Sequence, residues 1–141
     1  MPKLFVDSRQ GTFTVEGRVR VAAALTNLGI VCERLADTPK VRAGVWVFFT
    51  EHTADAIFSG GQVAPNSLIR LVVYALEGGL DGESKQRLIS NATAILGEHA
   101  KSIGEHATVY VIIREVPEVN WGMYGKQVSL AALRTDGWQT S

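Results

Sequence analysis

The sequence predicts an α+β fold in which two tandem β-α-β units form a four-stranded sheet with two helices on one face. Apolar β-branched runs alternate with segments of helical periodicity, and the order strand, helix, strand occurs twice in the 141 residues. The runs that close the two units, 45–51 and 109–115, align at a shift of 64 residues (109 − 45 = 64). Right-handed crossovers then place both helices on the same face of the sheet.

The first unit begins with a short strand at 4–6, and this strand is expected to end at the turn-prone segment 7–11. Thr14 is a suitable N-cap for a helix whose apolar residues recur at helical spacing. These residues are Val15, Val19, Ala22, Ala23, Leu25 and Leu28. We expect this helix to end near 36–39, because the residue before a proline avoids the helical region. The β-branched and aromatic run 45–49 predicts a strand that is covered on both faces.

The second unit repeats this plan. The apolar segment 68–76 predicts a strand, and the glycine-containing segment 77–80 predicts a turn. Asp81 is a suitable N-cap for the second helix. One side of that helix carries Leu88, Ile89, Ala92, Ile95 and Leu96. The closing strand is expected at 108–115.

We expect a single domain that spans residues 1–141, with pseudo-repeats of about 1–62 and 63–128 and a C-terminal tail at 129–141. Two helices can cover only one face of the sheet, so alternate side chains on its other face should remain exposed. These side chains are Trp46, Phe48, Val72, Tyr74, Tyr110 and Ile112. An open apolar face of this kind requires a partner, and a cyclic homo-oligomer would supply it.

The composition is that of a folded soluble protein, with 46% hydrophobic and 20% charged residues. The formal net charge is zero and no basic block is present, so nucleic acid is not expected as a partner. The apolar runs, such as 71–76, are too short to span a bilayer, and the N-terminus lacks the plan of a signal peptide. A single cysteine, Cys32, excludes an internal disulfide and favours a reducing, cytoplasmic compartment. The three histidines lack metal-ligand spacing, and no cofactor is expected.

Pro2 is the candidate catalytic residue. Once an initiator methionine is removed, Pro2 carries a secondary amine at the start of the hydrophobic segment 3–6. Burial disfavours the charged form of an amine and lowers its pKa from an ordinary value near ~8. A neutral amine can take a proton from carbon or attack a carbonyl, as a general base or a nucleophile. The alternative is structural, because a proline can simply begin an edge strand.

Several segments resemble those of the tautomerase superfamily, and they occur in the same order. Pro2 opens the first strand, residues 111–117 resemble the signature of the last strand, and residues 120–125 resemble the hairpin after it. Segments 48–61 and 115–126 are most similar to the long, trimeric group typified by cis-3-chloroacrylic acid dehalogenase. The resemblance covers most of the chain. It implies a doubled β-α-β fold, a homotrimer with pockets at subunit boundaries, and an N-terminal catalytic proline.

The resemblance also implies roles for individual residues. Pro2 matches the catalytic base, and Trp121 matches an aromatic residue that lines the pocket and keeps it dry. Tyr124 with Gly125 matches a Tyr-Gly pair of the dehalogenase group, and Lys126 stands where that group often has arginine. The alternative for Trp121 is a tryptophan that anchors the hairpin.

Three further residues are implied in substrate binding. Tyr110 stands where the 4-oxalocrotonate tautomerase branch has an active-site arginine. Arg114 lies on the same side of its strand as Tyr110, by the two-residue alternation, and could reach the same pocket. The alternative for Arg114 is an ion pair with Glu115 or Glu118, or exposure to solvent. Arg9 matches the general location of another substrate-binding arginine of that branch.

Other positions depart from the dehalogenase group. The turn 77–81 contains two acids and no arginine, where that group has two arginines that hold the substrate carboxylate. The group's helix histidine, water-activating glutamate and last-strand tyrosine fall at Gly29, Met123 and Ile112. The residues that would position and deprotonate water are therefore missing, which argues against hydrolytic dehalogenation.

The sequence thus predicts a cofactor-independent tautomerase that uses Pro2 as general base on small, conjugated 2-oxo or 2-hydroxy carboxylic acids. One alternative is a Pro2-dependent hydratase, decarboxylase or dehalogenase that acts on a small unsaturated or 2-oxo acid. Another is a non-catalytic trimeric scaffold of the same fold. Retention of Met1 would favour the scaffold, because it converts the Pro2 amine into an amide.

Overall fold

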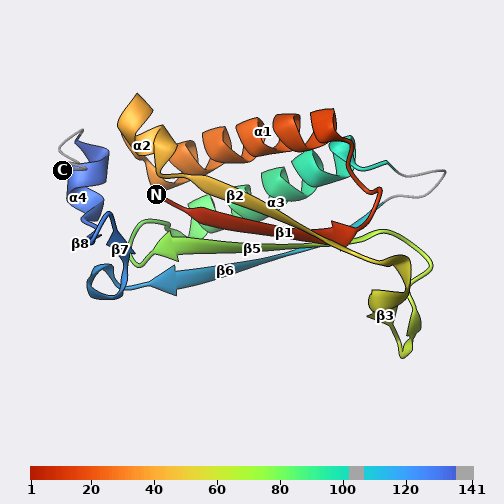
Figure 1. Ribbon diagram of the computed structural model, residues 1–141. Coiled ribbons are helices and arrows are strands. Elements are labelled where there is room, and N and C mark those ends of the chain that lie inside the picture. The colour runs from red at the N-terminus through yellow and green to blue at the C-terminus, as the bar shows by residue number, and fades with distance from the viewer. Residues whose placement is uncertain (102–106, 136–141) are drawn as a thin grey trace.

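The computed structural model describes residues 1–101 and 107–135 and shows a fold of two layers (Figure 1). One layer is a four-stranded sheet in the order β2-β1-β5-β6, and helices α1 and α3 cover one of its faces. The bounds are β1 Lys3–Arg9, α1 Val15–Glu33, β2 Trp46–His52, β5 Leu68–Leu76, α3 Gly82–His99 and β6 Thr108–Val116. The predicted α+β class is confirmed.

Strand pairing shows how the two units join. Strands β1 and β2 are parallel, β5 and β6 are parallel, and the central pair β1–β5 is antiparallel. Each unit is therefore one β-α-β crossover, and the two units meet across the antiparallel pair. The register places Lys3 opposite both Trp46 and Tyr74, and Tyr74 opposite Arg114. One end of the sheet thus brings together the start of the chain and the end of β6.

The internal repeat extends beyond the sheet. A 3-10 turn and a short hairpin follow β2, and the same elements follow β6. The first set is η1 Ala54–Ala56, β3 Phe58–Ser59 and β4 Gln62–Val63; the second is η2 Glu118–Asn120, β7 Gly122–Met123 and β8 Lys126–Gln127. Every element of the second set is shifted by 64 residues (118 − 54 = 64), the shift that relates the closing strands. Figure 1 shows β3 at one end of the sheet and the β7–β8 hairpin at the other.

Both predicted N-caps are confirmed. The Thr14 hydroxyl accepts a hydrogen bond from the Gly17 N–H at 2.8 Å, and the Asp81 carboxylate accepts one from the Ser84 N–H at 2.8 Å. The end of the first helix was predicted too late, because α1 stops at Glu33. Pro39 does not stop that helix; it starts a short helix, α2 Pro39–Ala43, because proline suits the first helical turn.

The strands differ from the prediction in length and in cover. Strand β1 continues to Arg9, three residues beyond the predicted end, because the turn-prone segment still pairs with β2. The prediction that the second strand is covered on both faces is wrong. Strand β2 is an edge strand, and Trp46 and Phe48 are 43% and 48% exposed. The rings of Trp46 and Phe48 lie on the face of the sheet that the helices do not cover.

The core lies between the helices and the sheet. Leu4, Val6, Leu71 and Val73 point from the strands toward the helices and are buried. The helices contribute Val21, Leu25, Leu88, Ala92 and Leu96. Four residues of the predicted apolar stripes lie outside the core, because Val15, Val19, Ala23 and Ile89 are exposed.

The other face of the sheet is open in the single chain, as the alternation predicts. Phe48, Tyr110 and Ile112 are each more than 40% exposed there. Phe5 belongs to the same surface, and its ring stacks on Phe48 with the centroids 5.4 Å apart. Neighbouring aromatic rings therefore cover a surface that neither α1 nor α3 reaches.

The predicted C-terminal tail contains a helix, α4 Leu130–Arg134. Leu133 is fully buried, and its carbonyl accepts a hydrogen bond from the Ala36 N–H at 2.8 Å. Residues 136–141 of the tail lie outside the described residues. No helix in the described part of the chain is long and apolar enough to cross a membrane.

Candidate active site

Pro2 is buried where the chain enters β1. Its ring lies against the backbone of α1, because a Cβ added at Gly29 would meet the Pro2 Cγ at 2.8 Å. A side chain at this helix position would have to displace the ring. Gly29 therefore allows α1 to approach the N-terminal end of β1.

A cavity of about 640 Å³ lies on the open side of the sheet beside this end of the chain. Its size suits a small ligand. Lys3 supplies an amine to its wall, and the β7–β8 hairpin forms one side. The other walls are largely aromatic: Phe5, Trp46, Phe48, Tyr74, Trp121 and Tyr124.

The Lys3 amine is held among aromatic rings and carbonyls. Its Nζ lies 4.8 Å from the centroid of the Trp46 ring and 5.8 Å from that of Trp121. It donates to the Gly44 carbonyl and lies 3.4 Å from the Met1 carbonyl oxygen. Burial lowers the pKa of Lys3 to about 8, although the nearby Glu33 opposes the shift.

Met1 fills the space beyond Pro2. Its side chain is fully buried, and its sulfur packs so closely on Gly44 that no Cβ would fit there. Burial lowers the pKa of the Met1 amine to about 6; Glu33 raises it and Lys3 lowers it further. The N-terminal end of the chain is therefore a place where an amine loses proton affinity.

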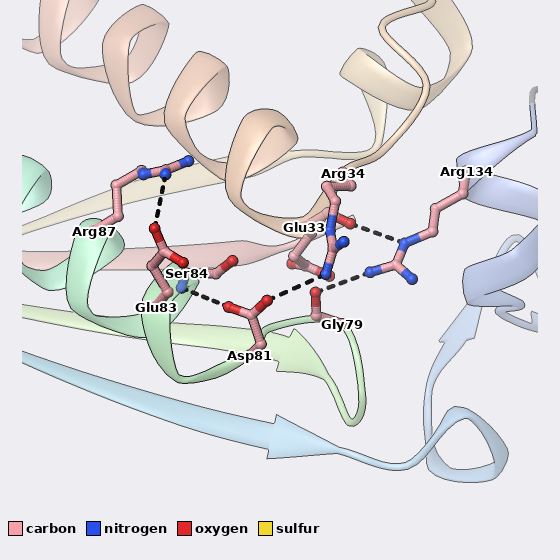
Figure 2. Close-up of polar contacts among 8 residues, drawn as sticks. All are labelled: Glu33, Arg34, Gly79, Asp81, Glu83, Ser84, Arg87 and Arg134. Carbon is pink, nitrogen blue, oxygen red and sulfur yellow. Dashed lines mark hydrogen bonds and ion pairs between the residues drawn. The ribbon is translucent and has the colours of Figure 1, made fainter.

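Glu33, the last residue of α1, lies close to both amines. Its side chain is 1% exposed, and neither carboxylate oxygen has a hydrogen-bond partner among the described residues. Burial raises the pKa of Glu33, and the N-terminal amine and Arg134 partly offset this effect. Figure 2 shows Arg134 bridging this region, because it donates to the Glu33 and Gly79 carbonyl oxygens, each at 3.0 Å.

The acidic turn after β5 is engaged by groups of the same chain. Asp81 caps α3 and also lies 3.4 Å from the Arg34 guanidinium (Figure 2). Although the turn has no arginine of its own, Arg34 reaches it from the end of α1 and Arg134 reaches it from α4. These two arginines bind protein groups there.

Comparisons with known proteins agree with this architecture. A model of the Tautomerase family, described as "Tautomerase enzyme", matches residues 71–131. The solved structure of N1, a member of the cis-3-chloroacrylic acid dehalogenase family, is 29% identical with a TM-score of 0.69. The match covers 90% of this chain and 83% of that one. The family model thus matches the second repeat of this chain to the tautomerase superfamily, and the N1 structure shares the fold over most of the chain.

Two other solved structures show the shared fold at lower identity. Native fused 4-OT is 23% identical with a TM-score of 0.71, over 89% of this chain and 94% of that one. The Q0 fused 4-OT symmetric trimer is 23% identical with a TM-score of 0.67, over 92% and 97%. A comparison with curated proteins finds no match. The doubled β-α-β unit of this chain therefore has the same fold as the fused 4-OT structures.

Four residues predicted for the site lie at one end of this tautomerase fold. Pro2 and Trp121 are buried, and Trp121 lines the cavity together with Tyr124. Tyr124 has a φ of 54° and forms the hairpin turn with Gly125, so its ring projects at the cavity edge. Arg114 lies next to the cavity wall, with its Nη1 3.4 Å from the Tyr74 hydroxyl.

Three other predicted residues are placed differently. Lys126 lies in β8, is exposed, and pairs across the hairpin with Met123. Arg9 ends β1, six residues from Lys3, which corresponds to about 20 Å at ~3.3 Å per residue. Tyr110 lines a second cavity at that far end, of about 530 Å³. A single chain does not bring Arg9 and Tyr110 to Pro2.

Sequence reasoning missed two charged residues of the site, Lys3 and Glu33. Lys3 could have been found from the alternation along β1, which places it on the same face as Phe5, directly after Pro2. An amine in an otherwise aromatic patch is unusual. Glu33 carried no local signal, because its burial depends on how α1, β5 and the C-terminal helix meet.

Proposed function

We propose that the protein is a cofactor-independent tautomerase in which Pro2, freed by removal of Met1, acts as general base on small conjugated 2-oxo or 2-hydroxy acids. The observation that carries this proposal is the position of Pro2. It is buried at the start of β1, next in sequence to Lys3, which lines the aromatic cavity. Burial lowers the pKa of the Met1 amine at this end of the chain, and burial of a free Pro2 amine would act in the same direction and favour the neutral, basic form.

The proposed reaction needs one proton to move twice. The Pro2 nitrogen takes a proton from the carbon next to the carbonyl, and the electron pair of that C–H bond forms an enolate. The proton then returns to another atom of the conjugated system. Trp121, which is 7% exposed, keeps water from the amine, and Arg114 beside Tyr74 would attract the substrate carboxylate.

We further propose that the protein acts as a homotrimer. The open aromatic face of the sheet needs cover, and two similar solved structures are described as trimers of fused 4-OT. A neighbouring subunit would also explain the positions of Arg9 and Tyr110, which a single chain leaves far from Pro2. Both residues would then contribute to a pocket at a subunit boundary.

The test combines an intact mass with a kinetic assay. Purified protein should lack the mass of Met1, and it should accelerate ketonisation of phenylenolpyruvate, followed by ultraviolet absorbance. Pro2→Ala should lower kcat/KM by about 10²- to 10⁴-fold, the usual contribution of a general base. A mass that retains Met1, or equal activity of Pro2→Ala, would overturn the proposal.

The buried Met1 favours a second candidate, a non-catalytic scaffold. A fully buried Met1 adds to the core, and its peptide bond makes the Pro2 nitrogen non-basic. If the mass shows Met1 in place and the protein is a trimer without activity, the scaffold is the better description. A hydrolytic activity like that named for the N1 family has less support, because Ile112 and Met123 cannot deprotonate water.

A further inference from the structure

Lys3 offers chemistry that the proposed reaction does not use. It lines the aromatic cavity through its own side chain, so its position there does not require a free Pro2 amine. We propose that Lys3 is a second reactive amine of this site and forms an imine with small aldehydes and 2-oxo acids. The inference is independent of the proposed tautomerase reaction, although removal of Met1 would take away one of the two carbonyl acceptors of the Lys3 amine.

The surroundings of the Lys3 amine carry this proposal. Its Nζ lies over the rings of Trp46 and Trp121, at 4.8 Å and 5.8 Å from their centroids. Its hydrogen-bond acceptors are the backbone carbonyls of Met1 and Gly44. In the part of the chain that the structure describes, no carboxylate forms an ion pair with it. Nothing therefore neutralises its charge directly, and a carbonyl compound in the cavity would meet it.

Burial, and not a neighbouring charge, favours the reactive neutral form of Lys3. Burial lowers the pKa of Lys3 to about 8 from 10.5, and the Glu33 carboxylate on α1 partly opposes this. The other titratable groups near Lys3 are the terminal amine, the Tyr74 and Tyr124 phenols of the cavity wall, and the Arg114 guanidinium beside Tyr74. At pH 7 a lysine with a pKa near 8 has roughly 300 times more neutral amine than one at 10.5.

The proposed step balances without an added reagent. The lone pair of neutral Nζ attacks the carbonyl carbon, and the C=O π electrons move to oxygen. A proton then passes from nitrogen to oxygen to give the carbinolamine. Its hydroxyl takes up a proton from water and leaves as water, while the nitrogen lone pair forms the C=N bond of a protonated imine. Hydrolysis reverses the sequence. The protonated imine withdraws electrons from the adjacent carbon, which is the basis of lysine catalysis on carbonyl substrates.

The cavity indicates which carbonyl compounds would fit. Phe5, Phe48 and Trp46 present apolar surface, so a substrate with an apolar or aromatic substituent gains from burial. Arg114, at the Tyr74 hydroxyl, would attract the carboxylate of a 2-oxo acid. We therefore expect phenylpyruvate to react in preference to pyruvate.

The experiment traps the imine on the full-length protein. Phenylpyruvate and cyanoborohydride are added at pH values from 6 to 10, and tandem mass spectrometry assigns each reduced adduct to a residue. Lys40 and Lys101, which are exposed, serve as internal controls. We expect Lys3 to react at least tenfold faster than either control at pH 7.5, with a rate that levels off above about pH 8. Equal rates for Lys3 and the control lysines would overturn the proposal.

The adduct map also separates this proposal from the previous one. An adduct confined to the N-terminal amine would overturn the role of Lys3 and leave a reactive Pro2 possible. An adduct on Lys3 in protein that retains Met1 would support the lysine while removing proline catalysis. Lys3→Arg, which keeps a positive charge, should abolish the adduct at this peptide, and circular dichroism would show that the variant folds.

Discussion

The two repeats end in the same backbone elements but surround them with opposite chemistry. Each hairpin borders a cavity, and Trp121 of the second repeat corresponds to Ile57 of the first at the shift of 64 (121 − 57 = 64). Beside the β3–β4 hairpin, Asp7 accepts from Arg70 at 3.1 Å and contacts His52 at 3.0 Å. Beside the β7–β8 hairpin, the contacts of the Lys3 amine within residues 1–101 and 107–135 are with aromatic rings and backbone carbonyls.

The two ends of the sheet therefore differ in the charged side chains that a substrate could meet. In the first-repeat cavity the charged side chains pair with one another, and hydrogen bonds from Arg70 and His52 hold Asp7 in its charged form. At the second-repeat end, the Met1 and Lys3 amines are buried with no ion pair among the described residues, and their pKa values fall. The two repeats have the same backbone elements, so a difference in function between them must come from their side chains. Here the difference is whether a charged side chain has an ion-pair partner.

The largest expected difference between the two ends is in the packing of their hairpins. Trp121→Ala should lower the free energy of unfolding by about 3–5 kcal/mol, because Trp121 is 7% exposed and a large cavity would remain. Ile57→Ala, at the matching position of the other repeat, should cost only about 1 kcal/mol, because Ile57 is half-buried. Urea unfolding of both variants tests the comparison. Equal losses would mean that the two hairpins are anchored alike.

A glycine pair tests whether close packing on Pro2 matters. Gly29 lies near the end of α1 and Gly97 near the end of α3, but of these two glycines only Gly29 packs against the N-terminal proline. Gly97→Ala should stabilise the protein by about 0.5–1 kcal/mol, because alanine favours a helix and the site is open. Gly29→Ala should gain nothing or lose about 1 kcal/mol, and it should lower kcat/KM by displacing Pro2. Thermal melts and the ketonisation assay measure both effects.

The smallest expected effect concerns the ion pairs of the first repeat. Burial alone would raise the pKa of Asp7, but hydrogen bonds from Arg70 and His52 lower it below its usual value. A carboxyl with a lowered native pKa stabilises the fold above its unfolded pKa, and that stabilisation is lost as the pH falls through the native pKa. Asp7→Asn should thus cost about 1 kcal/mol at pH 7 and nothing near pH 2.

Asp37→Asn is the matched control for that measurement. Asp37 also pairs with an arginine, at 3.0 Å from Arg42, but its side chain is 65% exposed. Solvent screens such a pair, and we expect no measurable change in stability at either pH. If both variants lose equal stability, the partial burial of Asp7 is not what gives its contacts their strength.

The sequence predicted the fold well where local and tertiary signals agree. Strand β5 and both helix N-caps lie where the apolar run and the capping residues put them. Errors arose where tertiary contacts override local preference. Pairing with β2 carries β1 through the turn-prone residues up to Arg9, and the chain resumes a helix at Pro39. The aromatic run at 45–49 gave no sign that β2 is an edge strand.

The candidate site was predictable only in part. Pro2, Trp121 and Tyr124 were proposed through a family resemblance; the structure places Trp121 and Tyr124 around one cavity and buries Pro2 next to Lys3 of that cavity. Lys3 could have been found from the alternation along β1, whereas Glu33 depends on the burial of the end of α1, which leaves no pattern in the sequence. The contributions of Arg9 and Tyr110 depend on assembly, which is a property of several chains.

The burial of Met1 has a consequence for any preparation of this protein. A fully buried methionine contributes to the core as other large apolar side chains do, and deleting such a side chain typically costs about 2–5 kcal/mol. Chains with and without Met1 should therefore differ in thermal stability although they come from one gene. Incomplete processing during overexpression would produce two melting transitions in one sample, and the activity would belong to the less stable species.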